Sequence, residues 1–393
     1  MKQGILTINA GSSSIKFALF PLANPISPDA EVSGQIDGIG TNATKMVAKN
    51  TAGERIADQL IPGEAVSHDV AFDALLKWFT ASQADWEIVA VGHRVVHGGD
   101  LYSQPTIVDA TVLGHLTSFI PLAPLHEPHN VAGIRALQTL MPRVPQVACF
   151  DTAFHRSQPN VAQAFGLPRA LTAEGIKRYG FHGLSYEFIA RALPEHSTRA
   201  NGRVVVAHLG NGASMAAMVK RKCVATTLGF STIDGLMMGT RCGNLDPGVV
   251  LHLMETKGLS VKDMTRLLYK ESGLLGVSGI SQDMRTLLAS NKAEAQEAVD
   301  LFCYRIVREL GSLVAAAGGL DALVFTGGIG EHAAEVRRRV CQQVECFGIR
   351  LDAEANDRHD LHIGTADSSV DVLVIPTNEE WMMAHHAQML LTL

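Results

Sequence analysis

Two glycine-rich hairpins in this chain have the composition of phosphate-binding turns. Residues 5–20 read ILTINAGSSSIKFALF and residues 204–219 read VVVAHLGNGASMAAMV. In each, an apolar run breaks at a polar residue, passes through glycine with serine or asparagine, and resumes as a second apolar run. Small residues at such a tip let main-chain N–H groups point into one concavity, where they bind phosphate without a side-chain cation. Two such tips, far apart in the chain, indicate a nucleotide held between two related halves.

A third glycine cluster offers a competing interpretation. The segment TGGIGEHAAEVRRRV at 326–340 follows the apolar run LVF and matches the G-x-G-x-x-A pattern of dinucleotide-binding folds, with Asp352 ending a possible next strand, FGIRLD. The match lies too close to the C-terminus to leave room for the rest of a doubly wound sheet, and it leaves both hairpins unexplained. A Walker A sequence is absent, so we also disfavour a P-loop fold.

Composition indicates a globular protein of two domains. The 393 residues are 47% hydrophobic and 18% charged, which predicts a well-packed interior rather than disorder, and the length favours two domains over one. The net charge of -6 argues against nucleic acid or an anionic membrane as the partner. An anionic substrate would therefore have to be met by cations concentrated at one place.

The cysteines and the N-terminus predict a soluble, cytoplasmic protein. The six cysteines form no C-x-x-C pair, which argues against a disulfide framework or a zinc ribbon and indicates a reducing compartment. The N-terminal apolar run is interrupted by Asn9 and Gly11 and is too short for a signal peptide. No run of about 18 apolar residues occurs, so we expect no membrane-spanning segment.

Hydrophobic periodicity predicts an α/β protein with mixed sheets. Apolar runs predict strands at residues 4–9, 14–20, 88–92, 145–150, 203–209, 214–219, 322–326 and 371–375. Helical periodicity predicts helices at residues 67–80, 130–140, 185–193, 247–256, 262–269, 293–317 and 332–343. The longest predicted helix ends at Gly318 and Gly319, which suits a C-cap. We place the domain boundary near residue 150, after the strand that ends there.

Short motifs along the whole chain resemble those of one known family. In chain order they are INAGSSSIK (8–16), HRVVHGG (93–99), LAPLHEP (122–128), FDTAFH (150–155), RYGFHG (178–183), HLGNGAS (208–214), GLMMGTR (235–241), FTGGIGE (325–331) and PTNEE (376–380). The chain resembles the acetate and propionate kinase family, within the actin-like, sugar-kinase-like phosphotransferases. The resemblance implies two ribonuclease-H-like α/β domains with mixed sheets and an ATP cleft between them. The acyl and phosphate side would comprise 1–150 with 381–393, and the nucleotide side 151–380.

The reaction that the resemblance implies is reversible, in-line transfer of a phosphoryl group from ATP to acetate, giving acetyl phosphate. Acetate is already ionised at neutral pH and needs no general base, so catalysis should consist of alignment and of cations aimed at the transferring group.

The resemblance assigns four catalytic residues. Arg94 and Arg241 would line the active site, since guanidinium forks suit carboxylate and phosphoryl oxygens. His182 would donate to the transferring phosphoryl group, and Asp151 would be the carboxylate that organises the metal and the reacting groups. Taken without the resemblance, the arginines could form surface ion pairs, His182 could be a packed core histidine, and Asp151 could be a helix cap or turn residue.

Magnesium is expected with ATP, and Mn²⁺ is the alternative ion. The resemblance points to Asn9 and Glu379 as its protein ligands, an amide and one carboxylate for an ion held mainly by nucleotide and water. Glu380 is the next residue in the chain and is the alternative metal ligand if the motif is aligned one position later. For Glu379 itself the simpler interpretation is a glutamate in the first turn of a helix.

The remaining assignments concern the nucleotide and the acyl group. The resemblance implies nucleotide contacts from Ser12, Ser14, Lys16, His208, Leu209, Gly210, Asn211, Gly212, Asp283, Met284, Arg285, Gly328, Ile329, Gly330, Glu331 and His332. It implies a substrate site formed by Arg94, Val96, Leu125, His126, Phe181 and Thr232, where His126 helps to orient phosphate.

Two departures from the family pattern leave details open. His332 stands where the family commonly has asparagine, and Thr232 stands where a pocket-lining proline would be. Because one methylene of substrate is worth only about 1–3 kcal/mol of discrimination, the preference for acetate over propionate stays open, although the bulk of Val96 favours acetate.

Other classes of function stay as alternatives. A sugar kinase of the same superfamily would phosphorylate a hydroxyl and need a base, and an actin-like ATP-binding clamp would show only slow hydrolysis and bind a peptide. The resemblance also implies a homodimer, for which the sequence itself offers no proof.

Overall fold

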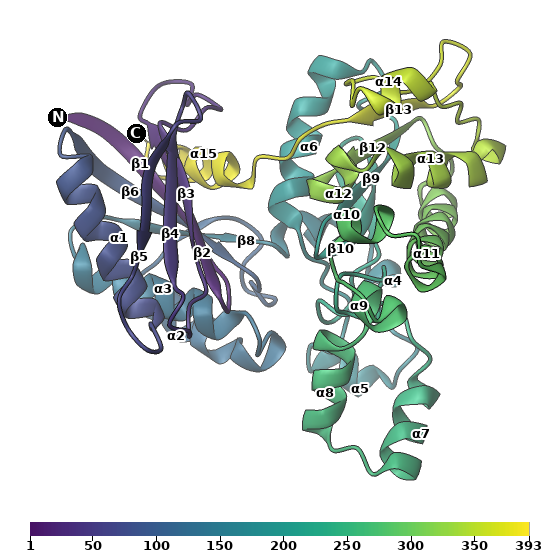
Figure 1. Cartoon of the computed structure of the whole chain (residues 1–393), viewed down its shortest axis with the longest axis horizontal. Coiled ribbons are helices and arrows are strands. Elements are labelled where there is room, and N and C mark those ends of the chain that lie inside the picture. Colours follow the sequence, from purple (N-terminus) through teal and green to yellow (C-terminus); the bar gives the residue numbers. More distant parts are fainter. Residues whose placement is uncertain (393) are drawn as a thin grey trace. The chain divides into compact units, whose positions relative to one another are not determined.

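The protein, described from a computed structural model, has two compact units (Figure 1). The structure describes residues 1–392. Unit 1 comprises Met1–Ala153 and Asn378–Leu393, and unit 2 comprises Phe154–Thr377. The domain assignment made from the sequence, with boundaries at 150 and 380, stays a prediction.

Unit 1 is built on an eight-stranded sheet in the order β5-β4-β3-β2-β1-β6-β8-β7. Its first five strands form an antiparallel meander, whereas β1, β6 and β8 are parallel neighbours. The strands are β1 (Lys2–Ala10), β2 (Ser14–Pro21), β3 (Val32–Asp37), β4 (Lys45–Asn50), β5 (Arg55–Leu60), β6 (Trp86–Val95), β7 (Thr106–Ile107) and β8 (Gln146–Phe150). Carboxyl ends of parallel strands meet at one edge of a sheet, which is where ligands bind in such folds.

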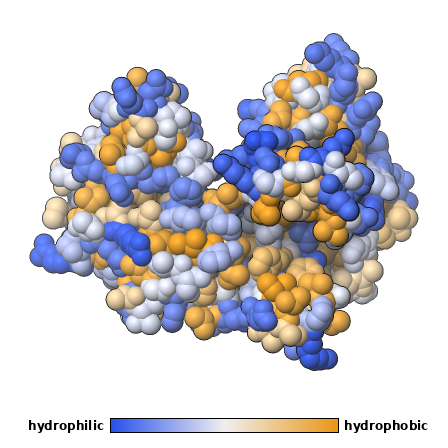
Figure 2. Space-filling model, turned by 90° about the horizontal axis from the view of Figure 1, so that it is seen from below, coloured by the Kyte–Doolittle hydropathy of each residue, from blue (hydrophilic) through white to orange (hydrophobic). Residues whose placement is uncertain are grey.

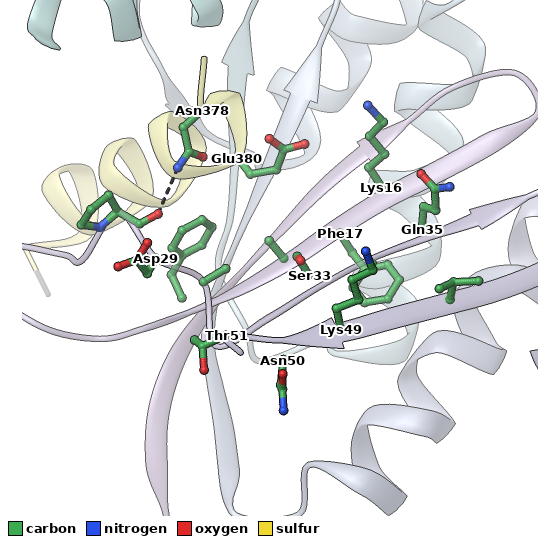
Figure 3. Close-up of a pocket in the computed structure, with 16 residues that line it drawn as sticks. Lys16, Phe17, Asp29, Ser33, Gln35, Lys49, Asn50, Thr51, Asn378 and Glu380 are labelled. Atoms are coloured by element: carbon green, nitrogen blue, oxygen red, sulfur yellow. Dashed lines mark hydrogen bonds between the residues drawn. The ribbon is translucent and has the colours of Figure 1, made fainter. Parts of the chain in front are cut away.

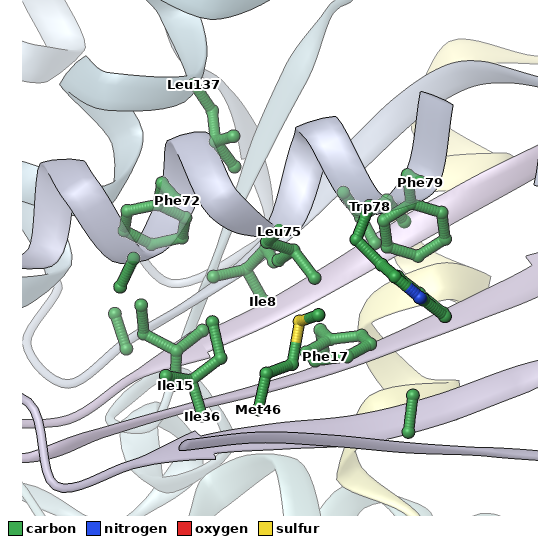
Figure 4. Close-up of a cluster of buried hydrophobic side chains, with 14 of the residues drawn as sticks. Ile8, Ile15, Phe17, Ile36, Met46, Phe72, Leu75, Trp78, Phe79 and Leu137 are labelled. Carbon is green, nitrogen blue, oxygen red and sulfur yellow. The ribbon is translucent and has the colours of Figure 1, made fainter. Parts of the chain in front are cut away.

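Helices cover both faces of this sheet. They are α1 (His68–Ser82), α2 (Ala110–Ser118), α3 (Glu127–Leu140) and α15 (Glu379–Leu391). Side chains alternate along a strand, so one face of β1 to β4 presents apolar residues that pack against α1 and α3 in the main core of the unit (Figure 4). Full burial of a side chain such as Phe72 stabilises this core by about 1.5–3 kcal/mol. On the other face, Gly92 admits α15, because a Cβ there would lie 2.9 Å from Met383 O.

Unit 2 is a five-stranded sheet between two long helices. The strand order is β11-β10-β9-β12-β13. The strands are β9 (Arg203–Leu209), β10 (Ala213–Val219), β11 (Lys222–Thr226), β12 (Ala322–Thr326) and β13 (Asp371–Val374). Tyr186, Ile189 and Leu193 of α6 (Gly183–His196) pack on one side of the core, and α11 (Ala293–Ala317) contacts the same strands. The predicted C-cap of α11 is confirmed, since Gly318 has a φ of 75° and its N–H donates to Ala315 O.

Shorter helices complete unit 2. They are α4 (Asn160–Gln163), α5 (Arg169–Ala173), α7 (Pro247–Lys257), α8 (Val261–Lys270), α9 (Gly273–Ser278), α10 (Met284–Leu288), α12 (Gly327–His332), α13 (Ala334–Gln343) and α14 (Ala353–Asp357).

The sequence-based elements need four corrections. Helices α2, α4, α5, α9, α10 and α14 were not predicted. Strands β3, β4, β5, β7 and β11 were not predicted, because they are short or polar on one face. The helix predicted at 130–140 begins at Glu127, where Pro128 occupies the first turn. The helix predicted at 332–343 is α13, which begins at Ala334, and His332 instead ends the preceding helix α12.

Candidate active site

A buried ion-pair cluster lies at the carboxyl ends of three neighbouring parallel strands in unit 1. Arg94 is near the end of β6, Asp151 directly follows β8, and Asn9 is near the end of β1. The Arg94 guanidinium donates from Nε to Asp151 Oδ1 at 3.0 Å and from Nη2 to Asp151 Oδ2 at 2.6 Å, which is bidentate geometry. Arg94 Nη1 lies 3.5 Å from Asn9 Oδ1, and Arg94 Nε lies 3.9 Å from Glu379 Oε2. Asp151 is therefore the counterion of Arg94 and not a helix cap.

Two carboxylates in this cluster oppose one guanidinium. The side chain of Asp151 is 1% exposed and that of Arg94 is 20% exposed. Burial alone would lower the pKa of Arg94, but the charges of Asp151 and Glu379 outweigh it and raise the pKa above its ordinary value. Burial raises the pKa of Glu379; Arg94 opposes that rise and Asp151 adds to it. Asp151 and Glu379 therefore repel each other, and Arg94 and Lys16 reduce the effect of this repulsion on Glu379.

The two glutamates that begin α15 have different surroundings. Glu379 faces the Arg94 cluster, whereas Glu380 lines a pocket of about 780 Å³ beside β2, β3 and β4. Figure 3 shows Lys16 of β2, Lys49 of β4 and Glu380 at this pocket. This geometry favours Glu379 over Glu380 as the carboxylate that acts together with Asn9.

The first predicted phosphate-binding hairpin is the turn between β1 and β2. Gly11 N donates to Ser14 O at 2.8 Å, which closes the turn, and Ser12 is exposed at its tip. Lys16 lies on β2 directly opposite Asn9 of β1. The predicted hairpin is confirmed, and its binding of phosphate stays a prediction.

In unit 2, His182 lies beside the second hairpin and has an unusual backbone conformation. It caps α6 with a φ of 59°, in the left-handed region that is uncommon for residues other than glycine and is often associated with function. His182 Nδ1 lies 2.8 Å from Ser214 Oγ, and the ring stacks on His208 with centroids 4.5 Å apart. His208 Nδ1 lies 2.8 Å from Ser185 Oγ. Through these contacts His182 Nε2 approaches the hairpin tip, where a Cβ at Gly212 would lie 3.3 Å from it.

Arg241 approaches the same hairpin tip. Its Nη1 donates to Thr232 O at 2.9 Å, and a Cβ at Gly212 would lie 4.0 Å from Nη1. Gly239 N in the loop before Arg241 donates to Asn211 O at 3.1 Å, and a Cβ at Gly239 would lie 1.9 Å from Asn211 Oδ1. A larger residue at position 239 would therefore displace the Asn211 side chain. Unit 2 therefore brings a guanidinium and an imidazole to one turn of backbone.

The segments assigned to adenosine lie at two short helices of unit 2. Asp283 caps α10 and pairs with Arg285 at 2.9 Å, while Met284 is buried. The segment 328–332 lies in α12, which directly follows β12, and Glu331 Oε1 accepts from Gly327 N at 2.8 Å. Contact of these segments with a nucleotide stays a prediction.

The dinucleotide-binding alternative lacks the strand that it needs. Leu351 forms only an isolated bridge with Gly364, and Asp352 is the N-cap of α14. The possible strand at 347–352 is therefore wrong, because the chain turns there to begin a helix. The glycine cluster at 326–340 belongs to a strand–helix junction of a different fold.

The residues assigned to the acyl group are divided between the units. Unit 1 contains Val96, which is buried just after β6, together with Leu125 and His126, which are half-buried before α3. Unit 2 contains Phe181, which is 1% exposed, and Thr232, which is half-buried. Their contact with an acyl group stays a prediction.

Sequence analysis missed the side chains that orient the assigned histidines. Ser214 bonds to His182, and Ser185 bonds to His208. A serine in an apolar strand or in the first turn of a helix carries no distinctive signal. Ser214 could have been noticed only because it ends the motif HLGNGAS.

Two further features concern membrane spans and metal-binding clusters. Within residues 1–392, no helix has the length and apolar character needed to cross a membrane. Across the same residues, no three side chains of His, Cys, Asp or Glu are grouped in a way that could hold a metal ion. A metal ion at the Arg94 cluster would therefore draw ligands from an amide, a substrate or water as well as from a carboxylate.

Known proteins resemble this chain over its whole length. Residues 4–385 match the Acetokinase family. The chain is 54% identical to a protein named acetate kinase from Rhodopseudomonas palustris, with 98% of each chain covered. It is 50% identical to one of the same name from Methylocella silvestris, with 100% of this chain and 98% of the relative covered.

Two solved structures share the fold of this chain over nearly its whole length. A propionate kinase from Francisella tularensis is 37% identical with a TM-score of 0.90, covering 98% of this chain and 99% of that one. An acetate kinase from Porphyromonas gingivalis is 34% identical with a TM-score of 0.88, covering 99% and 100%. The predicted fold class, an actin-like α/β protein with mixed sheets, is confirmed.

Proposed function

Because this chain belongs to the acetokinase family, we propose that it transfers the γ-phosphoryl group of ATP to acetate, giving ADP and acetyl phosphate. The observation that carries the proposal is the 54% identity to an acetate kinase over 98% of both chains. The geometry is compatible with this proposal, since each unit has an arginine close to a hairpin that the sequence predicts to bind phosphate. Arg94 lies beside Asn9 at the first hairpin, and Arg241 lies beside Gly212 at the second.

The chemical step needs alignment and charge neutralisation. An acetate oxygen attacks the γ-phosphorus, the bond from that phosphorus to the bridging oxygen breaks, and ADP leaves with the electron pair. We assign Arg94 and Arg241 to the carboxylate and phosphoryl oxygens, whose mutual repulsion is the main obstacle. Asp151 holds Arg94 in one orientation through two hydrogen bonds.

His182 is suited to donate a hydrogen bond to the transferring group. Tyr186 Oη lies 2.5 Å from Ser214 Oγ, so Tyr186 can donate to Ser214, and Ser214 can then donate to His182 Nδ1. In that arrangement the proton of the neutral imidazole sits on Nε2, the atom nearest the hairpin tip. That direction of donation would place the histidine in the tautomer that the proposed role needs.

We propose that Mg²⁺ accompanies ATP at Asn9 and Glu379, with Mn²⁺ as a substitute. An amide oxygen and a carboxylate are hard oxygen ligands, and a divalent cation would reduce the repulsion between Asp151 and Glu379. Magnesium would neutralise phosphate charge when bound. The nucleotide contacts proposed with it are those inferred from the sequence, from Ser12, Ser14 and Lys16 in unit 1 and from residues 208–212, 283–285 and 328–332 in unit 2.

Acetate should be used in preference to propionate. We expect kcat/KM to fall by about 10-fold or more for propionate, because the branched side chain of Val96, at the predicted acyl site, would oppose an additional methylene. A chain-length series from formate to butyrate, with acyl phosphate trapped as the hydroxamate, tests this. Failure to form any hydroxamate from ATP and acetate would refute the proposed function.

Propionate is the second candidate acceptor. The Francisella tularensis propionate kinase is 37% identical to this chain, and Thr232 lacks the stiffness of proline at the predicted acyl pocket. A higher kcat/KM for propionate than for acetate in the same series would establish this candidate instead.

We propose that the protein is a homodimer formed through unit 2. No residue of α7 is buried, yet the helix exposes Leu251 by 67% and Val249 by 39%, and Val261 at the start of α8 is 72% exposed. Figure 2, seen from the side on which α7 and α8 lie, shows apolar residues gathered on that part of the surface. We expect light scattering to give the mass of two chains, and Leu251→Glu to give that of one. A monomeric wild-type protein would contradict the proposal.

A cytoplasmic location is the remaining proposal. All six cysteines are free thiols, and thiols persist in a reducing compartment. Fractionation of cells that express the chain would test it, and recovery from the periplasm or culture medium would contradict it.

A further inference from the structure

The strands that carry Asn9 and Arg94 separate just before these residues. β1 and β6 pair in parallel register as far as Ile8 and His93, and the ladder stops there. A ladder that ends leaves backbone N–H and C=O groups that need other partners when they are buried. In unit 1 a side chain of α3 bonds to backbone groups close to Asn9 and Arg94.

One side-chain amide spans the gap between the strand ends. Asn130 Oδ1 accepts from Val96 N at 3.0 Å, and Asn130 Nδ2 donates to Ala10 O at 2.9 Å. Ala10 follows Asn9 directly and Val96 is two residues after Arg94. Asn130 is 3% exposed, so water does not compete for these bonds. The Asn130 amide thus accepts one hydrogen bond and donates another, as the backbone of a strand placed between β1 and β6 would do.

The first turns of two helices contact the same loops. Glu127 Oε2 of α3 accepts from His97 N at 3.2 Å in the loop after β6, and the Glu127 side chain is fully buried. His68 Nε2 at the start of α1 donates to Gly11 O at 2.7 Å in the hairpin tip, and its ring stacks on His129 of α3 with centroids 4.8 Å apart. Asn130 is therefore the central member of a set of contacts that tie both loops to α3.

We propose that Asn130 is a positioning residue that sets the spacing between Asn9 and Arg94, and with it the alignment of the metal-bound triphosphate. The inference rests on the function proposed above. Asn130 acts through the backbone of Ala10 and Val96 and not through contact with substrate. Loss of such a supporting contact typically costs about 10–100-fold in metal affinity or activity.

Two substitutions test this role separately from folding. Asn130→Asp keeps an acceptor for Val96 N but sets a carboxylate oxygen against Ala10 O, and Asn130→Ser is too short to span both groups. For each we expect the half-saturating Mg²⁺ concentration to rise about 10-fold and kcat/KM for ATP to fall about 10-fold or more. Calorimetric titration of Mg·ADP into each variant gives a second measurement that does not depend on turnover.

Gln388→Ala is the matched control. Gln388 is also a buried amide of unit 1, and its Nε2 donates to the backbone carbonyl of Ala23, away from the Arg94 cluster. We expect it to lower thermal stability and leave the Mg²⁺ dependence unchanged. Folded Asn130 variants whose Mg²⁺ dependence and Mg·ADP affinity stay within twofold of wild type would overturn the inference. A wild-type protein that makes no acetyl phosphate would instead refute the proposed function, and Mg·ADP affinity would still decide the role of Asn130.

Discussion

Arg241→Ala should lower kcat for acetyl phosphate formation by about 10³-fold and leave the affinity for ADP within about threefold of wild type. Such a loss corresponds to about 4 kcal/mol of transition-state stabilisation. The proposed reaction needs no covalent enzyme intermediate and no general base. Most of the rate acceleration must therefore come from cations that stabilise the negative charge of the transition state. Arg241 is one of two arginines that lie close to the hairpins predicted to bind phosphate.

The measurement pairs steady-state rates from the hydroxamate assay with calorimetric titration of ADP. Arg358→Ala is the control, because Arg358 is an exposed arginine of the same unit whose pair with Asp360 is remote from the hairpin. We expect this control to match wild type in both measurements. The kcat of Arg241→Lys should lie between that of Arg241→Ala and that of wild type, because lysine keeps the positive charge but lacks the guanidinium fork. An Arg241→Ala protein that kept a third of wild-type kcat would rule out the assigned role.

The core strands could be predicted because their burial is visible in their composition. Residues 203–209 were predicted as a strand and form β9, in which six of the seven residues are buried. A continuous apolar run bounded by polar residues has few other structures available to it. The same reasoning located β12 at 322–326, with all five residues buried.

The strands β3 to β5 could not be predicted from their own residues. Half of the residues in KMVAKN (45–50) and RIADQL (55–60) are polar, and in β5 only Ala57 is buried. Such segments become strands because each extends the meander by pairing with its neighbour. Tertiary context therefore outweighs local preference at this edge, and the polar face that results lines the pocket in Figure 3.

The residue types of the site were predictable from motifs, but its partners were not. Arg94 and Asp151 are 57 residues apart in the chain, and nothing in either motif indicates that they form a bidentate pair. The choice between Glu379 and Glu380 depends on which side of a helix faces the sheet. Asn130 was missed because an asparagine in a helix gives no signal until the backbone groups that it bonds are located.

Asp151→Asn should lower kcat by about 10²–10³-fold, because an amide cannot hold the Arg94 guanidinium by two charge-assisted hydrogen bonds. Removing one partner of a buried ion pair also costs about 3–5 kcal/mol of stability. Here we expect the lower end of that range, since Arg94 is 20% exposed and keeps Glu379 nearby. A folding stability of about 5–15 kcal/mol leaves such a variant mostly folded, so the loss of turnover would not simply report unfolding.

Asp321→Asn provides the matched comparison. Asp321 also receives bidentate hydrogen bonds from an arginine, with Arg203 Nη2 at 2.6 Å from Oδ1 and Nε at 2.9 Å from Oδ2, but it lies apart from the residues assigned to catalysis. Its pKa is lowered to about 2, chiefly by the hydrogen bond from Arg203, so the stability that this pair contributes is present at neutral pH and is lost as pH falls from about 4 toward 2. We expect Asp321→Asn to lower the unfolding temperature at pH 7 and to leave kcat unchanged. If both substitutions reduced kcat equally at matched stability, the Arg94–Asp151 pair would be a structural pair like that of Arg203 and not part of the catalytic machinery.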